Sequence, residues 1–534
     1  MPLSRTSSYR TVNSIPHLEQ ELVIQGNFIV PLHNPFTLNE CKLKESVRNG
    51  ETLSDDIITL GPGLEMRLDH VLHVNKCGII THFEHSQTDA SRRLLRQLEG
   101  TIDGPRESVT SSLSSATNDM SYIKLSEYEF CSPGFIDCHI HAPQYVFTGT
   151  ATDKPLMGDG GWLQKYAFPA EKTVRKMTLS DTSSNCPSKI DDVYQRVVRR
   201  TVCCGTTTAM YFGTVHLEPT KVLCQVISDV GQRGIVGKVC MDCNDLDHEY
   251  CQSLDQNISE TIQMIEYTQK LPNAKRGLLS PAITPRFIPS CSPTLLEELG
   301  RVAAQYKCHI QSHISESIDE ISAVTDKCIG NENNTDAQIF DDHGLLTDKT
   351  IMAHGNWLTD EDVQLLKNRG SAIAHCPLSN YFFAGKLLQT RQLMEKNLKI
   401  GLGTDVAGGY SPSMMDAARN AVITSQMVSW VQRHQGNPCN PVNHIIDYRH
   451  AYYLATLGGA EALGLQNIVG TFHVNKEFDA IVFSAAPSIT NNIDIFQADS
   501  KEDVFQKICN LGDDRNIVKV FVQGKEIKEK LLPV

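Results

Sequence analysis

The chain has 534 residues, of which 40% are hydrophobic and 21% are charged, and its formal net charge is −13. This composition is ordinary for a globular protein that buries a large core, and the length fits one barrel accompanied by a smaller domain. Acidic and basic residues are mixed along the chain, and no basic run marks a nucleic-acid groove. We therefore expect no nucleic-acid partner.

The cellular compartment is indicated by the N-terminus and by the cysteines. The N-terminal residues are polar, and no later apolar run approaches the length of a membrane span, so we expect no membrane attachment. The seventeen cysteines show no regular spacing, and a chain of this length does not depend on disulfides. These features predict a soluble cytoplasmic protein with reduced thiols.

Strand patterns occupy both ends of the chain. A turn signal at Gly26-Asn27 interrupts the first of them, and a Ser-rich stretch near 86–120 predicts an inserted surface loop. Because the two ends flank a long middle section, we predict a small β-sandwich domain built from residues 1–130 and 466–534. The strand-like runs are Leu22–Leu32, His70–Val74, Gly78–Phe83, Ala480–Phe483 and Ile517–Val522.

The middle section, residues 131–465, repeats a strand followed by a helix. Helical patterns such as Thr294–Tyr306 lie between the strands, and this one follows a Ser292-Pro293 start signal. No Gly-rich phosphate loop follows the first strand, so an α/β fold of the closed (β/α)8 TIM-like barrel type is favoured over an open doubly wound sheet. The eight apolar runs are Phe135–His141, Thr206–Gly213, Ile235–Asp242, Leu278–Phe287, His309–Glu316, Thr350–Asn356, Ser371–Pro377 and Leu398–Ala407.

Four of these strands end in polar side chains that can bind a metal. The first ends in His139 and His141, which share one face because strand side chains alternate. In a barrel the carboxyl ends of all strands converge on one mouth. Three nitrogens and one carboxylate oxygen then meet there, a ligand set suited to zinc or ferrous iron. The predicted ligands are His139, His141, His313 and Asp405.

Two further residues can support the chemistry of such a site. His354 ends the sixth run, either as a weak ligand or as a hydrogen-bond partner of the activated water. Glu316 lies three residues after a predicted ligand, near enough to exchange protons with that water. Each residue alone has an ordinary structural explanation, since strand-end histidines are usually satisfied polar groups and acids can cap helices. Because all of them are expected at the same barrel mouth, the metal-site interpretation is favoured.

Several motifs carry a family resemblance. His139-Ile140-His141, Ala353-His354-Gly355, the segment His375–Asn380 and Gly403-Thr404-Asp405 are similar to motifs of the amidohydrolase superfamily. Longer segments resemble its guanine deaminase family. These segments are Pro133–Tyr145, Trp162–Glu171, Gly237–Asp242, Thr284–Phe287 and Gln311–Glu316.

This resemblance implies a metal-dependent hydrolase. The family implication is one Zn2+ ion per chain and hydrolytic deamination of guanine to xanthine and ammonia, in purine catabolism or salvage. Glu316 would carry the proton from water to the purine ring, with His354 and Asp405 assisting. A homodimer is also implied. The metal ligands implied by the family are His139, His141, His313 and Asp405.

The resemblance also implies how the purine is bound. Trp162 and Phe168 are expected at the pocket wall. An arginine can donate hydrogen bonds to a purine carbonyl oxygen, which guanine has and adenine lacks. Arg286 has a second explanation as the partner of a surface acid, and Gln144 has one as a solvated loop amide. The implied substrate-binding residues are Gln144, Arg286, Phe287 and His354, with Trp162 beside them.

Three other functions stay open. The first is a related deaminase or chlorohydrolase that acts on another purine, a pterin or a triazine. The second is a two-metal hydrolase, which would need a carbamylated lysine such as Lys238 in the third strand run. The third is an inactive scaffold on the same barrel, although such a protein would be expected to lose metal ligands.

Some stretches depart from the family pattern by their extra length. We predict that all of them are surface loops. The Gly-rich stretch 157–161 lies close to the expected pocket, so it bears on substrate access. The stretches are 86–120, 157–161, 181–188 and 329–336.

Overall fold

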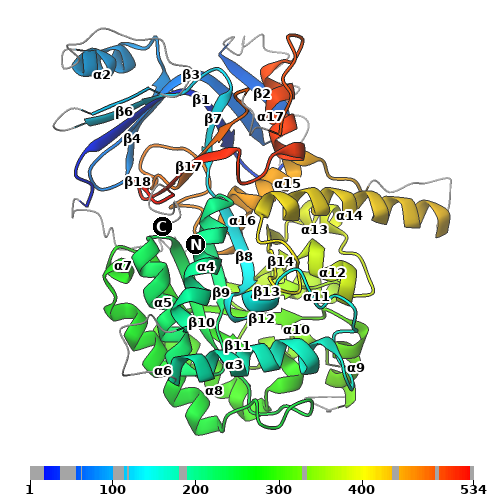
Figure 1. The fold of residues 1–534 in the computed structure, drawn as a ribbon. Coiled ribbons are helices and arrows are strands. Elements are labelled where there is room, and N and C mark those ends of the chain that lie inside the picture. Colours follow the sequence, from blue (N-terminus) through cyan, green and yellow to red (C-terminus); the bar gives the residue numbers. More distant parts are fainter. Residues whose placement is uncertain are drawn as a thin grey trace, which may run out of the picture.

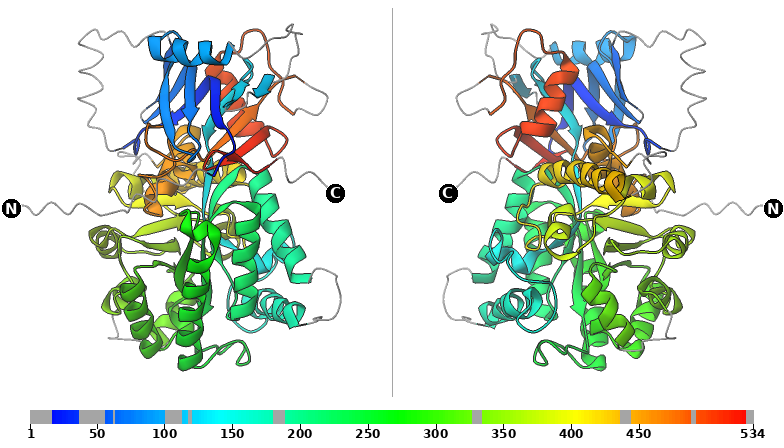
Figure 2. Two further views of the ribbon diagram at one scale, coloured as in Figure 1. Left: turned by 90° about the vertical axis from the view of Figure 1, so that its left-hand side faces the viewer. Right: turned by 90° about the vertical axis from the view of Figure 1, so that its right-hand side faces the viewer.

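The computed structural model describes residues 17–36, 56–61, 63–99, 113–116, 120–179, 189–326, 334–435, 444–487 and 492–528. These residues form a β/α barrel with a mixed sheet packed on one end of it (Figures 1 and 2). The predicted loop 181–188 and most of 329–336 lie outside the described residues.

Eight parallel strands form the barrel and confirm the predicted (β/α)8 class. Each strand pairs with its neighbour in chain order, from β8 to β15. Most are buried on both faces, as in β8 and β9, which explains why they appear in the sequence as continuous apolar runs. The strands are β8 (Phe135–His141), β9 (Thr206–Phe212), β10 (Arg233–Cys240), β11 (Leu279–Pro285), β12 (His309–Ile314), β13 (Thr350–His354), β14 (Ala372–His375) and β15 (Lys399–Leu402).

Two backbone hydrogen bonds join the carboxyl end of the first strand, β8, to the segment that directly follows the last strand, β15. The Asp405 N–H donates to the His139 carbonyl at 2.8 Å, and the His141 N–H donates to the Val406 carbonyl at 3.0 Å. This junction therefore lies among the residues predicted to bind metal.

Helices cover the outside of the barrel (Figure 1). Ser292 caps α8 by accepting from the Leu295 N–H at 3.2 Å, as the start signal predicted. No helix in the described part of the chain is both long and apolar enough to cross a membrane. The helices of this section are α3 (Phe168–Leu179), α4 (Lys189–Cys203), α5 (Leu217–Val230), α6 (Leu254–Lys270), α7 (Pro272–Lys275), α8 (Pro293–Tyr306), α9 (Ile318–Asp326), α10 (Asp336–Asp342), α11 (Asp360–Arg369), α12 (Pro377–Phe383), α13 (Thr390–Glu395), α14 (Met414–Gln435), α15 (Tyr448–Ala455) and α16 (Leu457–Ala462), with short turns η1 (Ala142–Phe147), η2 (Leu163–Ala167) and η3 (Ile288–Ser290).

Strands from both chain ends share one ten-stranded sheet, whose central path runs β18-β17-β16-β7-β1-β3-β2. The antiparallel pairing of β7 with β16 joins the two ends. All of these strands belong to one hydrogen-bonded sheet, and the predicted sandwich stays a prediction. The elements are β1 (Glu21–Pro31), β2 (Ile57–Gly61), β3 (Leu64–Val74), β4 (Ile80–His85), α2 (Asp89–Glu99), β5 (Leu113–Ala116), β6 (Met120–Lys124), β7 (Glu129–Pro133), β16 (Ala480–Ser484), α17 (Lys501–Leu511), β17 (Ile517–Val522) and β18 (Lys525–Glu526).

Two local predictions for this region are wrong. Gly26 does not turn the chain: β1 continues through it, with a register shift between Gly26 and Phe28 and a φ of 154° at the glycine. The stretch 86–120 is not all loop, because α2 and β5 form within it. Leu98 of α2 packs on Val23 and Val71, which stabilises this helix. The Ser-rich residues 108–112 lie outside the described residues.

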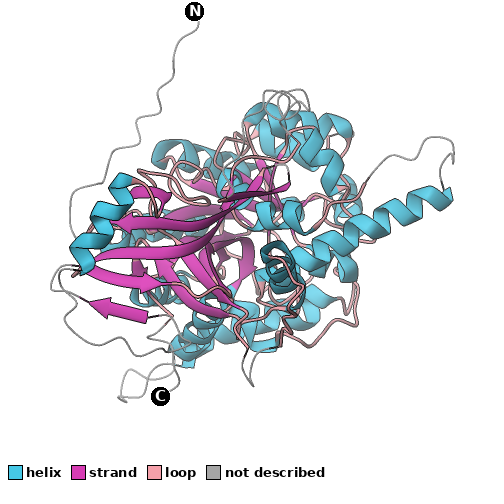
Figure 3. Cartoon of the chain, turned by 90° about the horizontal axis from the view of Figure 1, so that it is seen from above, coloured by secondary structure: helices cyan, strands magenta, loops and turns pink. Residues whose placement is uncertain are grey.

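A buried ion-pair cluster joins the sheet to the barrel. Arg233 begins β10 at the amino end of the barrel strands, and its Nε donates to Asp479 Oδ2 at 2.8 Å. Its Nη2 donates to Glu477 Oε2 at 2.7 Å. The sheet is therefore attached at the opposite end of the strands from the predicted metal site, and Figure 3 shows the molecule from the sheet side.

Candidate metal centre and active site

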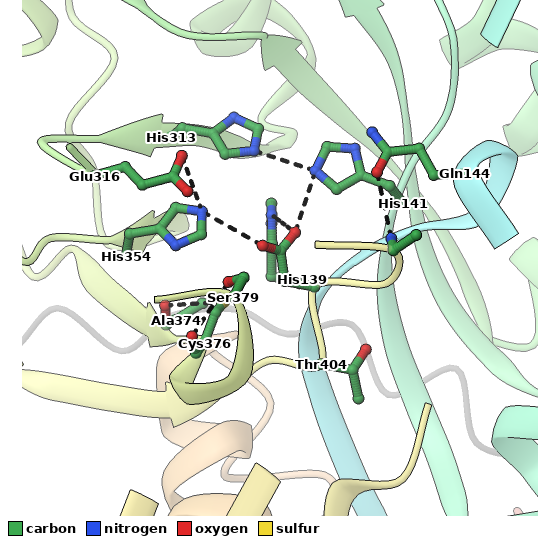
Figure 4. A network of polar contacts seen from close by, with 12 residues as sticks. His139, His141, Gln144, His313, Glu316, His354, Ala374, Cys376, Ser379 and Thr404 are labelled. Carbon is green, nitrogen blue, oxygen red and sulfur yellow. Dashed lines mark hydrogen bonds and ion pairs between the residues drawn. The ribbon is translucent and has the colours of Figure 1, made fainter. Parts of the chain in front are cut away.

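Three histidines lie together at the carboxyl ends of the barrel strands (Figure 4), and Asp405 lies beside them. His139 Nε2 lies 3.1 Å from Asp405 Oδ1, and His141 Nε2 lies 3.6 Å from the same oxygen. His141 Nε2 is also 3.1 Å from His313 Nε2. The four predicted ligands therefore lie close together: His139, His141 and Asp405 form one candidate metal-binding group, and His139 and His313 join His354 in another.

The donor atoms of this cluster fit a divalent cation. His313 Nδ1 donates to the Arg286 carbonyl at 2.6 Å, so its Nε2 presents a lone pair toward His141. His139 Nε2, which lies 3.1 Å from Asp405 Oδ1, is buried and makes no hydrogen bond among the described residues. Burial, followed by the neighbouring imidazoles, lowers the pKa of His141 and of His313 well below the ordinary value. Imidazoles whose lone pairs converge in this way can bind a divalent metal ion such as zinc.

Asp405 completes the cluster as an ionised carboxylate. Although burial opposes ionisation, the contact with His139 holds the pKa of Asp405 well below its ordinary value. Its backbone φ is 49°, in the left-handed region that few aspartates adopt. His354 has a φ of 74°. Such outliers gather at functional sites because the surrounding structure must enforce them.

Glu316 and His354 face each other beside the cluster (Figure 4). Glu316 Oε2 lies 3.6 Å from His354 Nε2, which is 3.8 Å from Asp405 Oδ2. His354 Nδ1 is paired with Asn380 Oδ1 at 2.9 Å, so the hydrogen sits on Nδ1 and Nε2 presents its lone pair to the centre. Burial and the charge of Asp405 raise the pKa of Glu316 well above its ordinary value. This carboxyl group can hold and return a proton.

Two other residues near the barrel mouth do not fit a metal-binding role. The Cys376 thiol lies close to His354 and Asp405, but it donates to the Ala374 carbonyl at 3.5 Å, and burial raises its pKa well above the ordinary value. It stays a thiol, whereas the thiolate is the metal ligand. Lys238 Nζ donates to Gln252 Oε1 at 2.7 Å and lies 3.7 Å from Glu260 Oε2. Lys238 is therefore engaged away from the histidine cluster, which does not favour the two-metal alternative.

A pocket opens beside the cluster and contains every residue predicted to bind substrate. Leu156, Leu163 and Phe383 also line it, and sequence reasoning gave them no role. Phe168 lies behind the wall rather than in it, with its ring 4.9 Å from the Arg286 guanidinium carbon. The predicted residues in the lining are Gln144, Trp162, Arg286, Phe287 and His354.

A family model described as the amidohydrolase family matches residues 130–527. The chain belongs to the amidohydrolase family. It is 44% identical to the guanine deaminase of Mus musculus over 410 residues, which cover 76% of this chain and 84% of that relative. The family resemblance predicted from the motifs is therefore confirmed, and the chain is a hydrolytic enzyme.

Solved structures of other amidohydrolases share the fold. Guanine deaminase from C. acetobutylicum, with bound guanine in its active site, has a TM-score of 0.73 at 24% identity and covers 95% of this chain and 100% of its own. An adenosine deaminase from Xanthomonas campestris with bound zinc has a TM-score of 0.67 at 20% identity, covering 96% of this chain and 93% of its own. These similarities confirm the barrel fold.

In this amidohydrolase the guanidinium of Arg286 is paired with a buried acid. Arg286 Nη1 donates to Glu171 Oε2 at 2.8 Å, and Nη2 donates to Glu171 Oε1 at 3.1 Å. Gln144 Nε2 donates to the same carboxylate at 2.9 Å. Arg286 thus has an acidic partner, as one sequence interpretation proposed, but that partner is buried and the arginine still lines the pocket. The sequence signal for Glu171 was a single acid in the first turn of a helix, directly after apolar residues.

The Gly-rich segment of the amidohydrolase flanks the pocket, as predicted. Leu156 and Trp162, on either side of it, contribute to the lining. Gly158 and Gly160 have φ values of 92° and 69°, which only glycine adopts without strain. The segment therefore shapes the wall through its backbone.

Proposed function

We propose that this amidohydrolase is a guanine deaminase that hydrolyses guanine to xanthine and ammonia in purine catabolism or salvage. The observation that carries the proposal is the presence of Arg286 and Gln144 in the pocket beside the metal-ligand cluster. Their N–H groups can donate to the carbonyl oxygen of guanine, which adenine lacks. The 44% identity to the Mus musculus guanine deaminase supports the same substrate.

One zinc ion per chain completes the proposed site. The donor set of three imidazoles and one ionised carboxylate fits zinc, and the Xanthomonas campestris relative has bound zinc. When bound, such an ion supplies the Lewis acidity that makes water nucleophilic near neutral pH. The residues that would hold it are His139, His141, His313 and Asp405.

The proposed roles of the other residues follow from their positions. Glu316 takes a proton from the attacking water and returns it to the ring nitrogen next to the amino-bearing carbon. His354 orients the water through Nε2, which faces both Glu316 and Asp405. Asp405 takes the second water proton and passes it to the amino group, which leaves as ammonia. Trp162 and Phe287 line the pocket around the planar base and exclude bulk water from it.

Ammonia release from a panel of bases tests the substrate. Guanine, adenine, cytosine, a pterin and a triazine are each incubated with the metal-loaded protein, with and without a chelator. We expect release from guanine alone, abolished by the chelator. Release from another base or from the triazine only would indicate the alternative deaminase or chlorohydrolase. No release from any compound would indicate an inactive scaffold.

We also propose a cytoplasmic homodimer. The dimer is supported by the family resemblance and by apolar side chains at helical spacing on α14, where Ile423, Met427 and Trp430 are 50%, 43% and 64% exposed. This helix extends beyond the body of the molecule (Figures 1 and 3). The free cysteines of the described chain suit a reducing compartment. Sedimentation of the wild type and of Trp430→Glu tests the dimer, which the variant should weaken.

A further inference from the structure

Glu171 has a buried carboxylate whose acceptor positions are all filled by the protein. Oε1 accepts from Gln144 Nε2 at 2.9 Å and from Arg286 Nη2 at 3.1 Å. Oε2 accepts from the Tyr250 hydroxyl at 2.5 Å and from Arg286 Nη1 at 2.8 Å. A carboxylate has about four lone-pair sites, so none is left for a ligand. Glu171 can therefore act on a substrate only through its neighbours.

These neighbours come from three separate loops at the barrel mouth. Gln144 lies in η1 after β8, Tyr250 follows β10, and Arg286 follows β11. The guanidinium of Arg286 also lies over the ring of Phe168, with its carbon 4.9 Å from the ring centroid. Because Arg286 has two hydrogen bonds to Glu171, the remaining N–H groups have a fixed direction.

The charge of Arg286 is balanced within the pocket wall. Burial lowers the pKa of Arg286, but the charge of Glu171 outweighs it, and the pKa is raised overall. The arginine therefore stays charged, and its partner makes the pair neutral. A neutral buried pair accommodates an uncharged ligand, whereas an anion would bring a charge that the desolvated wall does not compensate.

We infer that Glu171 is a positioning residue that makes the pocket select an uncharged purine carrying a carbonyl group. This inference rests on the proposed function, because it deepens the recognition of guanine. Glu171 directs the free N–H groups of Arg286 and Gln144 toward the ligand and cancels the positive charge behind them. Its effect is on substrate choice, and it makes no contact with the reacting atoms.

The variant Glu171→Gln tests this inference with three ligands. Guanine is the substrate, 2-aminopurine has the same amino group without the carbonyl, and urate has carbonyls but is an anion at neutral pH. In the variant we expect the KM for guanine to rise about 30-fold or more, with a smaller fall in kcat and unchanged zinc content. The preference for guanine over 2-aminopurine should shrink to about threefold or less. Urate should inhibit about tenfold more strongly than in the wild type, because Arg286 has lost its counter-charge.

Tyr250→Phe provides the matched variant, because it removes one donor to Glu171 and keeps the ion pair. We expect the KM for guanine to rise about two- to tenfold, with urate inhibition as in the wild type. A folded, zinc-loaded Glu171→Gln that keeps its guanine preference and its weak urate inhibition would overturn the inference. If that variant does not fold, Glu171→Asp replaces it, since it keeps the charge but shortens the reach. An unchanged KM in both Tyr250→Phe and Glu171→Asp would then overturn the inference.

Failure of the proposed function is distinguishable from failure of this inference. A wild-type protein without guanine turnover would refute the proposed function. In that case, calorimetry of 2-aminopurine and urate binding to the wild type and to Glu171→Gln still measures whether Glu171 makes the pocket prefer uncharged ligands. Equal urate affinity in the two proteins would refute the role of Glu171.

Discussion

The carboxylate of Asp137 binds Thr404, which lies 267 positions further along the chain. Its Oδ1 accepts from the Thr404 N–H at 3.0 Å, and its Oδ2 accepts from the Thr404 hydroxyl at 2.5 Å. Asp137 Oδ1 also accepts from the His139 N–H at 3.2 Å. One buried side chain thus holds two segments that carry proposed metal ligands, His139 and Asp405, near the point where the first and last barrel strands meet.

Replacing this carboxylate should weaken both the fold and the metal site. We expect Asp137→Ala to lower the free energy of unfolding by about 2–4 kcal/mol, because it leaves buried donors of Thr404 and His139 without partners. Urea unfolding of the metal-free protein measures this loss. Thr404→Val removes only the hydroxyl donor and should cost about 1 kcal/mol. Equal stability of Asp137→Ala and the wild type would contradict the role of the carboxylate.

The ion-pair cluster between the sheet and the barrel should contribute strongly to stability. Arg233 is buried with Asp479, so Arg233→Ala leaves an uncompensated charge, and we expect a loss of about 3–5 kcal/mol in thermal or urea unfolding. Arg369 pairs with Asp341 at 2.6 Å on the surface and is the matched control. Arg369→Ala should leave the unfolding midpoint almost unchanged. Similar losses in the two variants would show that burial does not set the strength of the pair.

Glu316→Gln should separate proton transfer from metal binding. We expect kcat to fall about 10²–10⁴-fold, because the amide cannot exchange protons with water and the purine ring. Zinc content, measured by elemental analysis, should equal that of the wild type. Asp319→Asn changes an exposed acid three residues away and should leave kcat unaltered. Loss of zinc from Glu316→Gln would instead identify this residue as a metal ligand.

Removal of the metal should lower stability as well as abolish turnover. A ligand that binds only the folded state stabilises it by about 4 kcal/mol at a thousand times its Kd. We therefore expect a chelator to lower the Tm and zinc to restore it, as followed by calorimetry. His139→Ala should show no such response. A zinc-dependent Tm of the same size in that variant would place the ion elsewhere.

His375 should make the stability of the metal-free protein depend on pH. It is fully buried, and both ring nitrogens lack a partner in the described chain. Burial, with His354 as a second cause, lowers its pKa to about 3, against about 6.5 for a free histidine. Between these values the unfolded chain binds a proton that the folded protein excludes. The contribution of His375 to the free energy of unfolding is therefore complete above about pH 6.5. It is lost as the pH falls below that value, by at most about 1.4 kcal/mol per pH unit.

The variant His375→Asn tests this titration directly. We expect its unfolding free energy to change less between pH 7 and pH 4 than that of the wild type. His473→Asn, at an exposed position, should retain the wild-type slope. Parallel curves for His375→Asn and the wild type would show that His375 is not the group responsible.

The sequence predicted the barrel well because its strands are buried on both sides. Such strands form uninterrupted apolar runs, and the polar side chains at the ends of four of these runs mark the barrel mouth. The strand prediction was wrong where the chain leaves the hydrogen-bonded sheet of the barrel. The last run was predicted to reach Ala407, yet β15 ends at Leu402, and Asp405 takes a left-handed conformation that no local pattern revealed.

Residues that act through distant partners were the hardest to find. Glu171 and Arg286 are 115 positions apart, and Tyr250 adds a third segment. Sequence periodicity reports which face of an element is buried, but it carries no information about which buried charges will meet. The proposed metal ligands were easier to single out because their residue types alone indicate the chemistry.

The shared sheet has a consequence for the order in which this enzyme can be assembled during translation. Strand β7 pairs with β16, for example Cys131 with Val482. Because β7 precedes the barrel in the sequence and β16 follows it, β16 leaves the ribosome only after the barrel has been synthesised. One edge of β7 must therefore stay unpaired while several hundred residues are synthesised, and unpaired edges attract other chains. A nascent chain halted before β16 would carry that open edge, which makes such fragments natural clients for chaperones.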